Sequence, residues 1–392
     1  MPREKQSARV DKLSGRTAAY VHAPMLLAND DPLPKDIQIA VFDPATVFRE
    51  RVKGRTTIYL DTNLWITLSD RKTPDARKAH EACLRGVADG RLLFPLSYAI
   101  VSELLEHPQN EERSAQATLM DALSLGVTFR AVELIYKLEA EVTYVRAFQE
   151  RDAEVDGTLL FTSIPDHIGD SILSIPAGSK PSQVAACLER LRTGPEYRSV
   201  HRLAGMLNLK DLQSHHRNSA DTFVSLTTES IKRMSGFRKG GKLDRERILL
   251  AERLMLFNEH VRPALVATLF DEVGPEKVAE TMDQWNNRYG EGSAERLTQW
   301  FQGMPALELS AEVMAARSLN PARQVQRQDF WDNEHALLAP VYANAFATLD
   351  GGLTDILRER CKTPKRHGCQ ILMGLTDLMQ FVKGSTHTDP LG

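Results

Sequence analysis

The chain has 392 residues, of which 42% are hydrophobic and 26% are charged, and this balance is typical of a folded globular protein. Its formal net charge of −3 excludes an overall basic field, so any surface that binds nucleic acid must be a local patch. No apolar run is long enough to span a membrane, and the first residues lack the apolar core of a secretory signal. The four scattered cysteines are too few for a disulfide framework, so we expect a soluble, cytoplasmic protein. The length of the chain predicts about two or three domains.

The first part of the chain has an α/β pattern. Residues 1–54 mix proline, acidic and basic residues around one strand-like stretch at 37–43, and we expect an N-terminal extension there. A β-branched and aromatic run at 56–60 predicts a buried strand, and helix-like apolar spacing follows it. The apolar run at 91–107 turns helical around Ser97 to Glu103, and 126–132 is a third strand candidate. Residues 55–145 are therefore predicted to form the first half of an α/β domain.

The strand signals fade in the middle of the chain and return near its end. Residues 146–310 have mostly helical periodicity, which predicts an α-helical insertion. Strand character returns at 343–350 and at 369–373, with a helix beginning after Gly351 and Gly352. We expect residues 311–392 to complete one α/β domain, whose central parallel sheet is flanked by helices and whose two halves meet in space.

Four acidic residues lie where this sheet is expected to end. Asp61 follows the first strand, Glu103 lies on the helix after the second, Asp332 lies early in a helix, and Asp350 ends the strand at 343–350. Parallel strands place their carboxyl ends at one edge, so we expect these acids to converge. Ionised carboxylates this close require cations, and oxygen ligands favour Mg²⁺ or Mn²⁺ over zinc. The alternative for Asp61 is that it only caps the following helix.

Such a metal site has a specific chemistry. Two divalent ions about 4 Å apart can clamp the attacking and leaving oxygens of a phosphodiester during hydrolysis. The four acids therefore predict a hydrolase that acts on nucleic acid.

The order and setting of these acids resemble those of PIN-domain nucleases. That family has an Asp in a D-x-N setting after the first strand, a Glu on a later helix, an Asp that opens a helix, and an Asp after the next strand, often with a Thr two residues before it. The matching positions here are Asp61 and Asn63 in LDTN, Glu103 in SELLEH, Asp332, Thr348 and Asp350. The resemblance covers residues 55–140 and 320–380 and implies a metal-dependent endoribonuclease that cleaves RNA in preference to DNA.

The chain also departs from compact members of this family, because a long insertion separates Glu103 from Asp332. Asp329 lies one helical turn before Asp332 and shares its expected helix face, so it is the alternative third acid. Two other functions stay open. One is a structure-specific DNA nuclease of the flap-endonuclease kind, with the insertion as an arch over the strand. The other is a nucleic-acid-binding or assembly protein that keeps a PIN-like body with little activity.

Two basic segments are candidates for binding a phosphate backbone. Arg238, Lys239 and Lys242 lie among glycines, which predicts a flexible basic loop. Lys365 and Arg366 belong to a second cluster that follows Asp350 in the sequence, and we expect it near the acidic site. The alternative for both is a solvated surface without a ligand. The expected partner is nucleic acid and not a membrane, and the sequence leaves open whether the chain forms a homo-oligomer.

Overall fold

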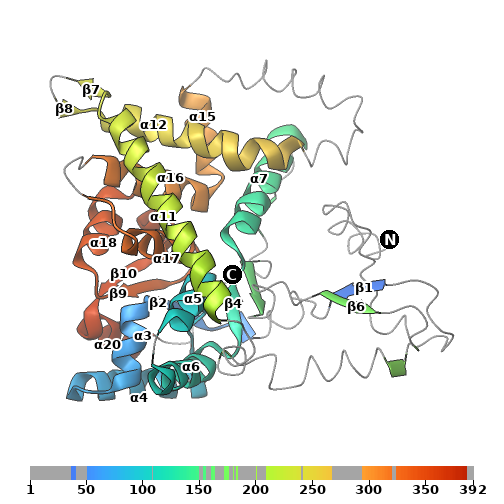
Figure 1. Cartoon of the computed structure of the whole chain (residues 1–392), viewed down its shortest axis with the longest axis vertical. Helices are drawn as coiled ribbons and strands as arrows, with labels where there is room; N and C mark the ends of the chain where they lie inside the picture. Colours follow the sequence, from blue (N-terminus) through green and yellow to red (C-terminus); the bar gives the residue numbers. More distant parts are fainter. Residues whose placement is uncertain are drawn as a thin grey trace.

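The protein is an α/β structure in which helices predominate (Figure 1). The computed structural model describes residues 37–40, 51–107, 109–149, 153–155, 160–163, 172–175, 180, 182–183, 200, 209–239, 242–266, 294–319 and 324–385. Within these residues, no helix is long and apolar enough to cross a membrane.

A four-stranded parallel sheet joins the two ends of the α/β region. Its strands are β2 (Thr56–Leu60), β3 (Leu92–Leu93), β9 (Ala345–Thr348) and β10 (Gln370–Met373). They lie in the order β10-β9-β2-β3, with β2 and β9 paired directly. A single parallel bridge between Leu96 and Thr128 extends this order to β4 (Val127–Phe129). The prediction that the two halves form one parallel sheet is therefore confirmed.

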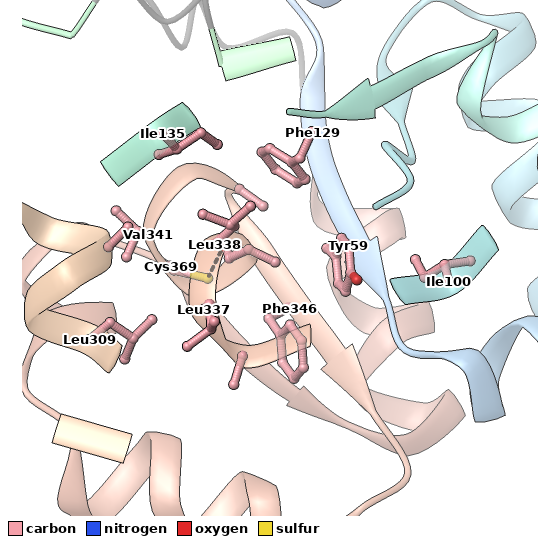
Figure 2. Packing of buried hydrophobic residues seen from close by; sticks show 14 of the residues in the cluster. Tyr59, Ile100, Phe129, Ile135, Leu309, Leu337, Leu338, Val341, Phe346 and Cys369 are labelled. Carbon is pink, nitrogen blue, oxygen red and sulfur yellow. Dashed lines mark hydrogen bonds between the residues drawn. The ribbon is translucent and has the colours of Figure 1, made fainter. Parts of the chain in front are cut away.

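The strands are short and apolar because helices cover them. All residues of β2 and β9 are buried, as expected for central strands of a parallel sheet. Tyr59 of β2 stacks on Phe346 of β9, with 5.7 Å between ring centroids, and its ring lies 6.1 Å from that of Phe129. Figure 2 shows these rings gathered with Leu337 and Leu338 in one core. Side chains from both halves of the chain therefore form this core.

Four of the helices around the sheet begin at a side-chain cap. These helices are α3 (Thr62–Asp70), α4 (Pro74–Ala88), α5 (Tyr98–Glu106), α6 (Asn110–Ser124), α7 (Val132–Gln149), α17 (Gln328–Tyr342), α18 (Gly351–Asp355), the π-helical turn η6 (Ile356–Arg360), α19 (Thr363–Arg366) and α20 (Gly374–Gly384). The side chains of Asp61, Thr73, Ser97 and Asp350 each accept a backbone N–H at the start of a helix. Such caps stabilise a helix by about 1 kcal/mol and fix where it begins.

The middle of the chain is helical, as predicted. Its described elements are α11 (Leu209–Met234), the hairpin β7 (Arg238–Lys239) and β8 (Lys242–Leu243), α12 (Arg245–Leu256), the π-helical turn η5 (Phe257–Val261), α15 (Ala294–Gln302) and α16 (Pro305–Ser318). Helix α16 is buried on almost all sides, and its apolar residues belong to the same cluster as those of the sheet. The predicted boundary at residue 310 therefore falls inside a helix that packs into the common core.

Buried carboxylates connect α16 to its neighbours. Glu139 of α7 accepts the N–H groups of Ala306 and Leu307 at 2.8 and 3.3 Å, which satisfies the first turn of α16. Glu308 accepts a hydrogen bond of 2.8 Å from Nε of Arg253 on α12. These contacts tie the helical region to the α/β region.

Besides the β7–β8 hairpin, the described residues form two further two-stranded sheets outside the central one. The strand predicted at 37–43 is formed in part by β1 (Ile37–Ala40), which pairs antiparallel with β6 (Ile172–Ile175). Strand β5 (Phe161–Ser163) pairs antiparallel with β4.

Candidate functional site

Asp61 and Asp350 lie at the carboxyl ends of neighbouring strands. Asp61 directly follows β2, and its N–H donates to Ala347 O of β9 at 3.0 Å. Thr348 Oγ1 donates to Asp61 Oδ2 and accepts the N–H of Asp350 at 2.9 Å, so Thr348 joins the two acids. The strand order reverses between β2 and β9, and ligands of α/β proteins bind at such a reversal.

Asp61 is buried, and both of its carboxylate oxygens accept hydrogen bonds. Its Oδ1 accepts the N–H of Leu64 at 3.0 Å, and its Oδ2 accepts the N–H of Leu349 at 3.3 Å in addition to Thr348. Burial raises the pKa of Asp61, and these hydrogen bonds oppose the rise without cancelling it. Asp61 does cap α3, but a carboxylate oxygen has two lone pairs, so capping does not exclude a second role.

Glu103 reaches the same region from α5. Its Oε2 accepts hydrogen bonds from Thr62 Oγ1 on α3 and from His335 Nε2 on α17, the latter at 2.7 Å. Burial alone would raise the pKa of Glu103, but the charge and hydrogen bond of His335, with the hydrogen bond of Thr62, leave it below its ordinary value. Glu103 is therefore held as an ionised carboxylate between two helices.

Asp332 completes the group from the first turns of α17. Burial, and then the repulsion of Asp350, raise its pKa to about 6. The side chain of Gln328, one turn earlier, lowers the pKa of Glu103 and limits the rise in the pKa of Asp332. His335 interacts electrostatically with Glu103, Asp61 and Asp332. The structure therefore brings together all four acids that the sequence singled out.

Asp329, the alternative third acid, has a different place. Its Oδ1 pairs with Nη1 of Arg317 at 2.8 Å, and its Oδ2 accepts the N–H of Gln326 at 2.8 Å. Both members of this ion pair are buried, and they join the start of α17 to the end of α16. The structure therefore favours Asp332 as the third acid and gives Asp329 a structural role.

The supporting residues fall into two groups. Thr348 is fully buried against Asp61, whereas Asn63 is exposed in the first turn of α3. Gln328 and His335, which interact with the acids from the same helix, were not predicted from the sequence. A signal was present in DNEH, where His335 lies three residues after Asp332 and must share its helix face.

The placement of Lys365 and Arg366 beside the acids was wrong. Both residues are exposed on α19, and the chain passes from there into the first residue of β10, whose N–H donates to Asn344 O at 3.0 Å. Asn344 precedes β9, whereas Asp350 follows it. The two basic residues therefore lie toward the end of the sheet where its strands begin, and the length of β9, roughly 13 Å at about 3.3 Å per residue, separates that end from the acids.

The other basic segment is a short hairpin and not an irregular loop. Strands β7 and β8 pair across residues 240 and 241, and Lys242 is exposed. The side chains of Arg238 and Lys239 lie outside the described part of the structure. Figure 1 shows the hairpin at the periphery, away from α3, which Asp61 caps, and from α5, which carries Glu103.

The carboxylate oxygens are ligands that a hard cation prefers, but they are not arranged around a single ion position. Four carboxylates are the donor set that Mg²⁺ or Mn²⁺ prefers. In the described residues, however, no three His, Cys, Asp or Glu side chains are arranged to hold one ion. The reason is that Asp61 points to Thr348 and Glu103 to His335. Metal binding would therefore require these side chains to share their oxygens with the ion.

Comparison with protein-family models, with curated proteins and with solved structures finds no match to this chain.

Proposed function

We propose that this chain is a metal-dependent, PIN-like nuclease that hydrolyses phosphodiester bonds of RNA. The observation that supports this best is the meeting of Asp61, Glu103, Asp332 and Asp350, from four different elements, at the edge where the strand order reverses. Burial raises the pKa of Asp61, and burial together with the repulsion of Asp350 raises the pKa of Asp332, so ionising both carboxylates in the folded state is unfavourable. A divalent cation would relieve this repulsion.

The residues of such a site would have different roles. Asp61 and Asp350 would hold Mg²⁺ or Mn²⁺ from the sheet, and Glu103 and Asp332 would hold it from the helices. When bound, the cation would supply Lewis acidity at the phosphate and neutralise its charge. Thr348 orients Asp61, and Thr62 orients Glu103. The exposed Asn63 lies beside Asp61, where its amide can donate to a substrate oxygen. The preference for RNA over DNA rests on the resemblance to PIN-domain nucleases.

The test is Asp61→Asn, with cleavage of single-stranded RNA, single-stranded DNA and a DNA flap measured in Mn²⁺. Asn is as good a helix cap as Asp, so α3 should persist while one negative charge disappears. We expect cleavage of RNA by the wild type, no cleavage by the variant, and unchanged folding by circular dichroism. Asp355→Asn, which removes an exposed carboxylate of α18, is the control and should cleave as the wild type does.

Undiminished cleavage by Asp61→Asn in Mn²⁺ would exclude Asp61 from the reaction. A preference of the wild type for the DNA flap would favour the flap-endonuclease alternative.

A further inference from the structure

A buried chain of hydrogen bonds leads from the core to the proposed metal site. Ser97 Oγ lies 2.6 Å from Tyr59 OH, which lies 2.7 Å from Nδ1 of His335. On the other side of the ring, Nε2 lies 2.7 Å from Oε2 of Glu103. Tyr59 is 1% exposed and His335 is 3% exposed, so water does not compete for these contacts. These hydrogen bonds link Ser97, Tyr59 and His335 to the carboxylate of Glu103.

The hydrogen-bond partners of Ser97, Tyr59 and His335 determine which atom carries each proton. Ser97 Oγ accepts the N–H of Ile100, so its own proton is available for Tyr59, and the proton of Tyr59 is then available for Nδ1 of His335. Nε2 then carries the ring proton and donates it to Glu103. If the ring carries two protons, the order of donation through Tyr59 reverses, but Nε2–H still points to Glu103.

The third protonation form of His335, a neutral ring with its proton on Nδ1, is electrostatically unfavourable. A neutral ring with its proton on Nδ1 would set the lone pair of Nε2 against a carboxylate oxygen 2.7 Å away. In both favourable forms, His335 therefore donates to Glu103.

We infer that His335 is a positioning residue, which holds the Glu103 carboxylate in place for metal binding while Tyr59 and Ser97 hold the ring. This inference rests on the proposed function. Glu103 needs such support because it reaches the site along a flexible side chain, whereas Asp61 and Asp350 follow strands directly. His335 also lies one helical turn after Asp332, so α17 supplies one ligand and orients another. Hydrogen bonds to a ligand from outside the coordination sphere typically change metal affinity by about 10- to 100-fold.

The experiment measures Mn²⁺ affinity of the full chain by calorimetry, together with thermal unfolding in the absence of metal. We expect His335→Ala to weaken Mn²⁺ binding by about 10- to 100-fold. His335→Gln, whose amide keeps a donor for Glu103, should restore part of the affinity. Tyr59→Phe removes only the hydroxyl that holds the ring and should weaken binding by a smaller factor than His335→Ala.

Tyr136→Phe is the matched control. Tyr136 is also a buried tyrosine, 4% exposed, whose hydroxyl contacts a serine, Ser310. This variant should lose stability to the same extent as Tyr59→Phe and keep the Mn²⁺ affinity of the wild type. The comparison separates a general loss of stability from a specific effect on the site.

Each of the following four results would overturn the inference. Unchanged Mn²⁺ affinity in Tyr59→Phe and in His335→Ala, while Asp61→Asn abolishes binding, would show that His335 does not position Glu103, although the proposed function would stand. If His335→Ala does not fold, unchanged Mn²⁺ affinity in Tyr59→Phe alone would also show that His335 does not position Glu103. Hyperfine coupling of bound Mn²⁺ to a nitrogen that disappears in His335→Gln would make His335 a ligand. If Asp61→Asn binds Mn²⁺ as the wild type does, the proposed function fails and the inference fails with it.

Discussion

Replacing Asp332 with Asn should stabilise the metal-free protein and abolish its metal binding. Burial and the repulsion of Asp350 raise the pKa of Asp332 from 3.8 to about 6. This shift corresponds to about 3 kcal/mol of unfavourable free energy when the group is ionised in the folded state. Because the side chain is partly exposed, solvent screening reduces this figure, and we expect a gain of about 2 kcal/mol.

The sign of the pH dependence follows from proton binding. The folded state holds the proton of Asp332 more tightly than the unfolded state, so the wild type loses stability as the pH rises from 3.8 to about 6. Asn has no proton to lose, so the advantage of the variant should grow over this window and be complete above it. Urea unfolding in EDTA, at about pH 4 and about pH 8, measures both free energies.

Mn²⁺ should then raise the stability of the wild type and not that of Asp332→Asn, because a ligand stabilises only a fold that binds it. Asp355→Asn is the control for the loss of an exposed charge and should change the free energy of unfolding by less than about 0.5 kcal/mol. An equal free-energy difference between Asp332→Asn and the wild type at both pH values would refute the reasoning, since it would show that the carboxylate is not destabilised by its surroundings.

Three further predictions concern residues around the site. Burial raises the pKa of Glu139 from 4.5 to about 7. The free energy of unfolding of Glu139→Gln should therefore rise by up to about 3 kcal/mol relative to that of the wild type as the pH increases through this window. Urea unfolding measures this difference, and a difference that does not change with pH would contradict the prediction. Asp329→Asn removes the negative charge that pairs with buried Arg317 and should cost about 3–5 kcal/mol. The folded variant should keep its Mn²⁺ affinity by calorimetry, and a specific loss of binding would return Asp329 to the ligand set. Reversing both charges of Lys365 and Arg366 to Glu should leave RNA cleavage and its salt dependence unchanged; a flatter salt dependence would mean that the substrate reaches the amino edge of the sheet.

The central strands and the meeting of the acids could be predicted because they depend on local pattern and on one topological rule. The β-branched and aromatic run at 56–60 became β2, and the run at 343–350 contains β9. Parallel strands end on the same side of a sheet, and the direct pairing of β2 with β9 then brings Asp61 and Asp350 close together.

The placement of Lys365 and Arg366 failed because nearness in sequence was taken for nearness in space. Between Asp350 and β10, the chain runs through α18, η6 and α19 back to the amino edge, as every connection between parallel strands must. The roles of Asp329 and His335 depend on side chains from other helices, namely Arg317 of the preceding α16 and Glu103 of α5. Periodicity places a residue on a face of a helix, but it does not determine which element packs against that face.

The central claim, that the two halves of the chain build one metal site, can be tested by combining substitutions at Asp61 and Asp350. Thr348 already connects these two acids through hydrogen bonds. If both hold the same ion, the first substitution should remove most of the Mn²⁺ affinity, and the second should cost little more. Calorimetric titration of Asp61→Asn, Asp350→Asn and the double variant should therefore show strong non-additivity, because additivity is expected only of independent sites. Losses of binding free energy that add within about 0.5 kcal/mol would mean that the sheet brings the two acids together without making them ligands of a common ion.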